Sequence, residues 1–203
     1  NNIEGFYAAF RQHAIKAPLM NQLFHDVSGS DITLCHGDVD IQDNRSPYYR
    51  AGVKAAVLPM IANQGYFLGA SSEEMRHAWQ DHHGMITGDD ADSDQSRQAY
   101  MAEVFMAEAD GATFAVATAY QLREAGDASA WAFFSQSDYH APIAQAFEAS
   151  LRDAGVGEGD APSNAQWRDA MRAGFTAWYE DGGFPAFYAD YNAKRIEDRA
   201  DTT

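Results

Sequence analysis

The apolar positions of the chain recur mostly with the spacing of an α-helix. In residues 3–16, Phe6 and Phe10 fall on one stripe, which predicts an amphipathic helix. Pro18 is expected to end it, since proline cannot continue a helix. A second short apolar segment follows at 19–24. The chain is therefore expected to begin with helical structure.

Strand patterns are concentrated between residues 31 and 58. Residues 31–36 alternate polar and apolar side chains, as a half-buried strand does. The apolar run that starts at Gly52 favours a second extended segment, although Pro59 argues against a central position in a sheet. These segments predict a small, partly antiparallel sheet.

The remainder reads as helices separated by polar, glycine-rich breaks. Ser71 or Ser72 is the expected N-cap of a helix of about three turns that ends near Gly84. An acidic loop follows, and Ser93 or Asp94 is the expected cap of a long central helix. The later helices are predicted at 95–124, 128–136, 141–154, 165–179 and 184–195. The aromatic stripe of the last helix, from Phe184 to Tyr191, is typical of core packing or a dimer contact.

Length and charge narrow the class of protein. A chain of 203 residues with 46% hydrophobic residues fits a single mainly helical α+β domain over 1–203. Its formal net charge of −16 argues against nucleic acid and anionic membranes as partners. No apolar run approaches the roughly 20 residues of a membrane span. The single Cys35 and the absence of signal-peptide features favour the cytoplasm, although a chain without an initial Met leaves room for a removed upstream segment.

One stretch carries candidate chemistry, the Glu73-Glu74-x-x-His77 pattern. In the zinc-binding H-E-x-x-H motif, two histidines share a helical face and the glutamate acts as general base. Here Glu73 stands where the first histidine would be, while Glu74 and His77 keep the other two positions. The simpler interpretation is a solvated acidic turn with a surface histidine.

A second acidic group favours the metal interpretation. Glu108 and Asp110 lie on the long apolar helix, Glu108 being 31 residues beyond His77. Carboxylates among Phe105, Met106 and other apolar side chains are costly to bury unless they are paired or bound to a metal.

Together these residues resemble a known family. The segments Glu74–Gln80 and Glu108–Gly111 look like those of bacterial metallopeptidases of the gluzincin type, in which the helix reads H-E-[LIM]-R-H-A-x-Q and the later one E-A-D-A. Residues 173–179 are also similar. The resemblance implies a zincin-like fold with a sheet beside the motif helix, a peptide or protein substrate, and zinc.

The same resemblance assigns roles to residues. Glu73, His77 and Glu108 would be the metal ligands, and Glu74 the catalytic general base. Asp110 would orient a ligand from outside the coordination sphere.

The departure at Glu73 lowers the expected activity. One imidazole with two carboxylates suits zinc less well than two imidazoles with one carboxylate. Added negative charge also weakens the metal as a Lewis acid. We therefore expect weakly bound or absent zinc and weakened or lost peptide hydrolysis. The alternative is a non-catalytic binding or scaffold protein that retains the fold.

Other histidines and other metal chemistries are less favoured. His82 and His83 would not share the ligand face, and His36 and His140 read as ordinary polar residues. A di-iron bundle requires two E-x-x-H elements, and of the seven histidines only His77 has an acidic residue three positions before it. Arg76 is expected to pair with an acid such as Asp81 or Glu73.

Overall fold

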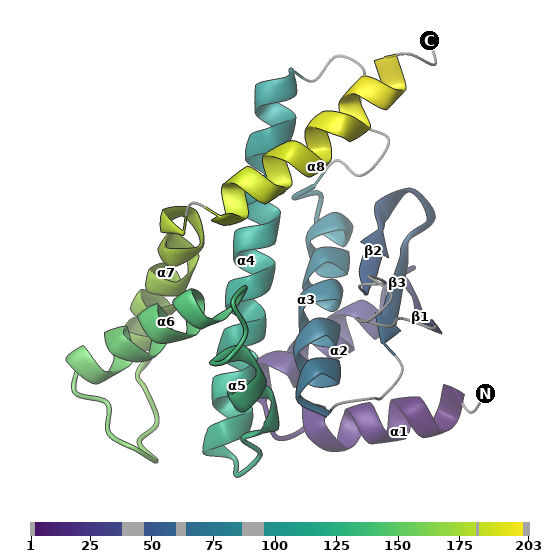
Figure 1. The fold of residues 1–203 in the computed structure, drawn as a ribbon. Coiled ribbons are helices and arrows are strands. Elements are labelled where there is room, and N and C mark those ends of the chain that lie inside the picture. The colour runs from purple at the N-terminus through teal and green to yellow at the C-terminus, as the bar shows by residue number, and fades with distance from the viewer. Residues whose placement is uncertain (1–2, 38–46, 60–63, 87–95, 182, 201–203) are drawn as a thin grey trace.

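The chain is mainly helical with one small sheet, as predicted. A computed structural model describes residues 3–37, 47–59, 64–86, 96–181 and 183–200. The helices are α1 (Ile3–Ala14), α2 (Pro18–Ser28), α3 (Gln64–His82), α4 (Arg97–Glu124), α5 (Ser129–Phe134), α6 (Ala141–Asp153), α7 (Asn164–Glu180) and α8 (Gly183–Ala200). The strands are β1 (Thr33–Gly37), β2 (Tyr48–Arg50) and β3 (Ala55–Pro59), with a short 3-10 helix at Ala51–Val53. Figure 1 shows α3 along one side of the sheet, with α4 beyond it and α1 below.

The sheet has the strand order β1-β3-β2 and is partly antiparallel, as predicted. β1 pairs with β3 in parallel, and β2 pairs with β3 antiparallel, with Tyr49 opposite Ala56. β3 is nevertheless the central strand, contrary to the expectation from Pro59. Pro59 occupies its last position, where a missing N–H interrupts the ladder least. Alternate residues of β3, Ala56 and Leu58, are buried.

The motif helix begins earlier than predicted. α3 starts at Gln64, so Ser71 and Ser72 lie inside the helix and are fully buried instead of capping it. The hydroxyl of Ser72 donates to the carbonyl of Leu68 at 2.7 Å, which satisfies it within the helix. Gly69 does not break the helix: a Cβ there would lie 2.2 Å from the Phe134 ring, so the glycine lets α5 pack closely.

α3 occupies the centre of the molecule, between the sheet and α4 (Figure 1). Its buried Met75 and Ala78 belong to the main hydrophobic core. α4 contributes fully buried alanines such as Ala109 and Ala112, whose small side chains permit close helix packing. The predicted long central helix is therefore confirmed. Its N-cap is Ser96, while the predicted caps at 93 and 94 lie outside the described residues.

The C-terminal helices pack on α4 at two places. α6 and α7 pack on each other and on α4, and α8 crosses the N-terminal half of α4 (Figure 1). Trp178 of α7 is fully buried, and its ring stacks on that of Phe184 with centroids 5.9 Å apart. Tyr188 of α8 is hydrogen-bonded to Glu108, so α8 lies beside the part of α4 that carries Glu108. Among the described helices, none has the length and apolar character needed to cross a bilayer.

Candidate metal centre

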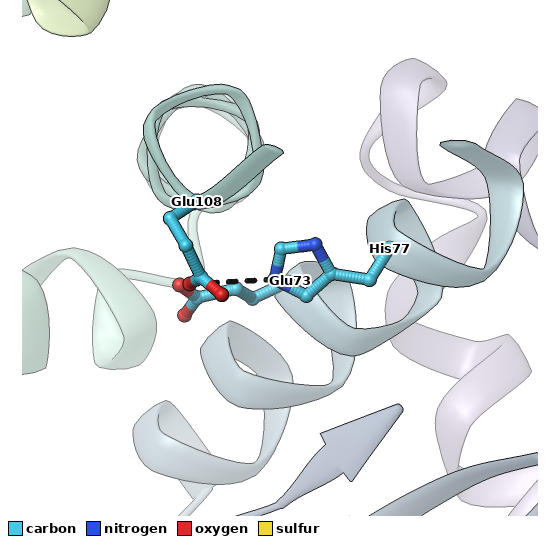
Figure 2. Close-up of side chains that lie close together, drawn as sticks. All are labelled: Glu73, His77 and Glu108. Atoms are coloured by element: carbon cyan, nitrogen blue, oxygen red, sulfur yellow. Dashed lines mark ion pairs between the residues drawn. The ribbon is translucent and has the colours of Figure 1, made fainter. Parts of the chain in front are cut away.

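Three residues predicted as metal ligands lie together between α3 and α4. Glu73 and His77 are one turn apart on α3, and Glu108 comes from α4. One potential ligand atom from each residue lies within 4.8 Å of the other two. Nε2 of His77 is 3.7 Å from Oε2 of Glu108. Figure 2 shows the two carboxylates and the imidazole pointing toward one another.

A glycine on α4 makes room for the imidazole. A Cβ added at Gly111 would lie 2.9 Å from Cε1 of His77 and 3.2 Å from its Nε2. The first distance is shorter than non-bonded carbon atoms tolerate. The ring of His77 therefore lies directly against the backbone of α4, and any side chain at position 111 would displace it.

The orientation of His77 is set by Gln80. Nε2 of Gln80 donates to Oδ2 of Asp110 at 2.6 Å and to the carbonyl of Ala107 at 3.2 Å. These two acceptors place the amide oxygen of Gln80 toward His77, where it lies 3.0 Å from Nδ1. Nδ1 must then carry the hydrogen, because an amide oxygen only accepts. Nε2 is left facing the two carboxylates.

Asp110 is hydrogen-bonded to two residues of α3. Arg76 donates to its two oxygens, from Nε at 2.7 Å and from a terminal nitrogen at 3.2 Å. The expectation that Arg76 pairs with Asp81 or Glu73 is thus wrong, because the guanidinium reaches across to α4. Asp81 instead accepts from the Tyr49 hydroxyl at 2.5 Å. Asp110 is therefore tied to α3 by both Arg76 and Gln80.

Glu74 lies beside the three candidate ligands and borders the same cleft. Its carboxylate accepts a hydrogen bond from the backbone N–H of Tyr49 in β2. Burial and the nearby Glu73 and Glu108 raise the pKa of Glu74 to about 8, although the charge of His77 acts in the opposite direction.

The cluster formed by His77 and the three glutamates has more acidic than basic side chains. Burial lowers the pKa of His77, but Glu108, Glu74 and Glu73 outweigh it and raise the pKa to about 9. Burial also raises the pKa of Glu108, with Glu73 adding to the effect and His77 opposing it. Three carboxylates around one imidazolium would leave a net charge of −3 + 1 = −2 when all are ionised. A divalent cation would neutralise this charge, so the donors fit such an ion.

A cleft of about 580 Å³ opens over these residues. One wall includes Tyr48 and Tyr49 of the edge strand β2, and another includes Phe187, Tyr188 and Tyr191 of α8. The aromatic stripe of α8 fits the predicted core packing in part: Phe184 belongs to the core and Tyr188 packs against it, whereas Phe187 and Tyr191 are exposed. None of the described residues that line the cleft is a lysine or arginine.

His140 lines the cleft, although its sequence context indicated only an ordinary polar residue. Nε2 of His140 lies 3.4 Å from Oε2 of Glu73, and the histidine is 8% exposed. The two residues are 67 positions apart, so no local spacing could indicate this contact.

The hydroxyl groups of Tyr139 and Tyr188 also meet in the cleft, 3.1 Å apart. Burial raises the pKa of both tyrosines well above the usual value, and nearby glutamates add to it. Both hydroxyls therefore stay protonated at neutral pH and remain able to donate hydrogen bonds.

His82 and His83 lie away from the centre, as expected. His82 and His83 are exposed at the end of α3. Nδ1 of His82 is 3.7 Å from Asp31, and the ring of His83 lies over Trp79 with centroids 4.1 Å apart. The side chain of His36 lies outside the described residues.

Comparison with known proteins gives one match. Residues 2–203 match the profile of a family described as "Putative metallopeptidase family (DUF6782)". No curated protein and no solved structure matches the chain. Because the match extends over almost the whole sequence, the chain belongs to this family.

Proposed function

We propose that the protein is a zinc-dependent metallopeptidase-like protein whose hydrolytic activity is weakened by its Glu73-Glu74-x-x-His77 motif. The observation that carries the proposal is the convergence of Glu73, His77 and Glu108, with Glu74 beside them in an open cleft. Membership of a family described as metallopeptidases points to the same class of reaction.

The ligand set would be Glu73, His77 and Glu108. Zinc ligands lie about 2.0–2.2 Å from the ion, so any two of them are at most roughly 4.4 Å apart. The observed limit of 4.8 Å needs only small side-chain movements to reach that spacing. When bound, the cation supplies a Lewis acid that polarises a peptide carbonyl and lowers the pKa of water.

Glu74 would be the general base. Its carboxylate borders the same cleft as the ligands, where a water molecule could reach it. A bound cation would favour the ionised form of Glu74, whose pKa is raised in its absence, and so would keep it able to accept a proton. It would accept a proton from the attacking water and deliver it to the departing amine. General bases of this kind contribute about 10²–10⁴-fold to the rate.

We extend the proposal to a zincin-like arrangement of the fold. The arrangement of the elements supports this: the edge strand β2 runs antiparallel to β3 and lies beside the motif helix α3. The third ligand comes from a separate downstream helix, α4. An extended peptide would bind along β2, where Tyr48 and Tyr49 border the cleft.

The weakening follows from Glu73. A carboxylate in place of an imidazole is a poorer donor for zinc and adds negative charge, which reduces the acidity of the bound ion. The protein would therefore bind zinc less tightly than a site with two histidines and would hydrolyse peptides more slowly.

The test combines metal content with peptide cleavage. The wild-type protein, His77→Ala and Glu74→Gln are purified without chelators, analysed for metal and assayed with a fluorogenic peptide library and added zinc. With added zinc, we expect the wild type to bind about one zinc per chain, His77→Ala to lose this binding, and Glu74→Gln to bind zinc without cleaving peptides. A wild type that neither binds stoichiometric zinc nor cleaves peptides, even with zinc added, overturns the proposal. Zinc binding with cleavage equal to that of Glu74→Gln instead identifies a non-catalytic binding protein.

A further inference from the structure

His140 reaches the metal centre from a different part of the fold. It immediately precedes α6, and its Nε2 lies 3.4 Å from Oε2 of Glu73 on α3. The two side chains are only 10% and 13% exposed. A contact between a histidine and a carboxylate at this depth excludes most water, so it is stronger than a surface pair.

The ring of His140 is fixed by its surroundings. Its centroid lies 4.2 Å from that of Phe134 and 4.5 Å from that of Tyr139. Although His140 is the N-cap residue of α6, its side chain makes no capping hydrogen bond. The imidazole contacts Glu73 and does not cap its own helix.

The hydrogen-bond pattern indicates which nitrogen donates. A carboxylate oxygen accepts hydrogen bonds, so Nε2 of His140 carries the hydrogen that it shares with Oε2 of Glu73. Nδ1 then accepts from the hydroxyl of Ser137, which lies 3.5 Å away. A chain of contacts thus runs from Ser137 through His140 to Glu73.

We propose that His140 is a positioning residue of the metal centre, holding Oε2 of Glu73 so that the other oxygen of that carboxylate faces the cation. This inference rests on the proposed metal-binding function. His140 is not itself a member of the group of ligand atoms within 4.8 Å of one another, which consists of Glu73, His77 and Glu108. His140 thus contacts Glu73 without belonging to this group of ligand atoms. Hydrogen-bonded partners of this kind orient metal-binding carboxylates and strengthen their binding.

Two substitutions of similar size separate the effect of the Nε2–H donor of His140 from that of side-chain volume. His140→Gln retains an N–H near the position of Nε2, whereas His140→Met has a similar length and no donor. Zn²⁺ and Co²⁺ affinities of the chelator-treated full chain are measured by competition titration. We expect His140→Met to weaken binding about 10–100-fold and His140→Gln to recover most of the loss. The exposed His82, replaced as His82→Met, is the control and should bind as the wild type does.

X-ray absorption of the bound metal separates positioning from ligation. We expect one imidazole on the metal in the wild type and in His140→Gln, contributed by His77. Two imidazoles in the wild type would overturn the positioning role, because His140 would then be a ligand. Should His140→Met fail to fold by circular dichroism, His140→Leu replaces it as the variant without a donor.

The failures of the two proposals are distinguishable. If the wild type binds no stoichiometric metal, the proposed function fails and this inference fails with it. If His77→Ala abolishes binding while His140→Met and His140→Leu bind as tightly as the wild type, the metal centre stands and the role of His140 is overturned.

Discussion

The side-chain oxygen of Gln80 lies 3.0 Å from Nδ1 of His77, one turn earlier on the same helix. Gln80 is in turn fixed by Asp110 of α4, at 2.6 Å from its Nε2. A residue on the motif helix and a residue on the packing helix thereby determine together which nitrogen of His77 faces the carboxylates. The orientation of this histidine is thus a tertiary property and not one of the motif alone.

Removing the amide of Gln80 should loosen the metal. Gln80→Met keeps the length and apolar volume of the side chain but lacks the acceptor for Nδ1 of His77. We expect zinc affinity to fall about 10–100-fold, the usual effect of losing such a partner. Competition titration with a chelating dye measures it. The control is Gln22→Met. Gln22 lies in α2, and its side chain makes an exposed hydrogen bond to Asp26 of the same helix. Equal affinities of Gln80→Met and the wild type would show that Gln80 does not orient His77.

A methyl group at position 111 should conflict with His77. Gly→Ala inside a helix ordinarily stabilises by about 1 kcal/mol, but overpacking costs about 1–3 kcal/mol. At Gly111 the added carbon would lie 2.9 Å from Cε1 of His77, so we expect the cost to prevail and the metal affinity to drop. The free energy of unfolding is measured by urea denaturation.

A double-mutant cycle tests the cause of that loss. In a His77→Ala background the ring is absent, so Gly111→Ala should there stabilise the protein by about 1 kcal/mol. The same destabilisation in both backgrounds would mean that the conflict lies elsewhere than with His77.

Much of the helical architecture was predictable because apolar spacing reports which face of a helix is buried. The start of α3 was not, because Gly65 and Gly69 ordinarily break helices. In this fold they are needed for close contact: a Cβ at Gly65 would lie 2.2 Å from the carbonyl oxygen of Ser129, near the start of α5. The gain from packing α5 onto α3 outweighs local propensity, and only the tertiary structure reveals it.

The residues of the candidate site likewise include some that the sequence indicated and one that it did not. Glu73, Glu74 and His77 were found from spacing on one helix, and Glu108 from a resemblance together with the cost of burying an acid. His140 has no such signal, since its relation to Glu73 arises from the path of the chain between α5 and α6. Sequence spacing therefore identifies candidate ligands on one helix but not the groups that other elements bring to them.

The metal-free protein should lose stability as pH rises. The pKa of Glu74 is raised from 4.5 to about 8, and that of His77 from 6.5 to about 9. The folded state thus holds more protons than the unfolded state between each pair of values, so the free energy of unfolding falls with increasing pH. The contribution of Glu74 declines from about pH 4.5 to 8, and that of His77 from about 6.5 to 9. Each extra proton corresponds to at most about 1.4 kcal/mol per pH unit.

Urea denaturation between pH 5 and 9 in the presence of a chelator measures this dependence. Glu74→Gln removes one titrating group, and we expect its stability to decline less steeply than that of the wild type below pH 6.5. The variant serves as the matched control for buffer effects. A wild-type stability that increases from pH 5 to 8 would contradict the expected sign.

Restoring the missing histidine should strengthen zinc binding. Glu73→His replaces an oxygen donor with the nitrogen that zinc prefers and removes one negative charge from the group around His77. We expect tighter zinc binding than in the wild type and, since the ion becomes a stronger Lewis acid, faster peptide cleavage. Glu73→Gln is the control, because it removes the charge without supplying an imidazole and should bind zinc more weakly. Zinc binding by Glu73→His should also depend less on His140, because the carboxylate oxygen that His140 contacts in the wild type is absent. Adding His140→Met to Glu73→His should therefore lower the zinc affinity only slightly. Unchanged zinc affinity in Glu73→His would mean that residue 73 does not bind the ion, and the ligand set would then have to be reassigned.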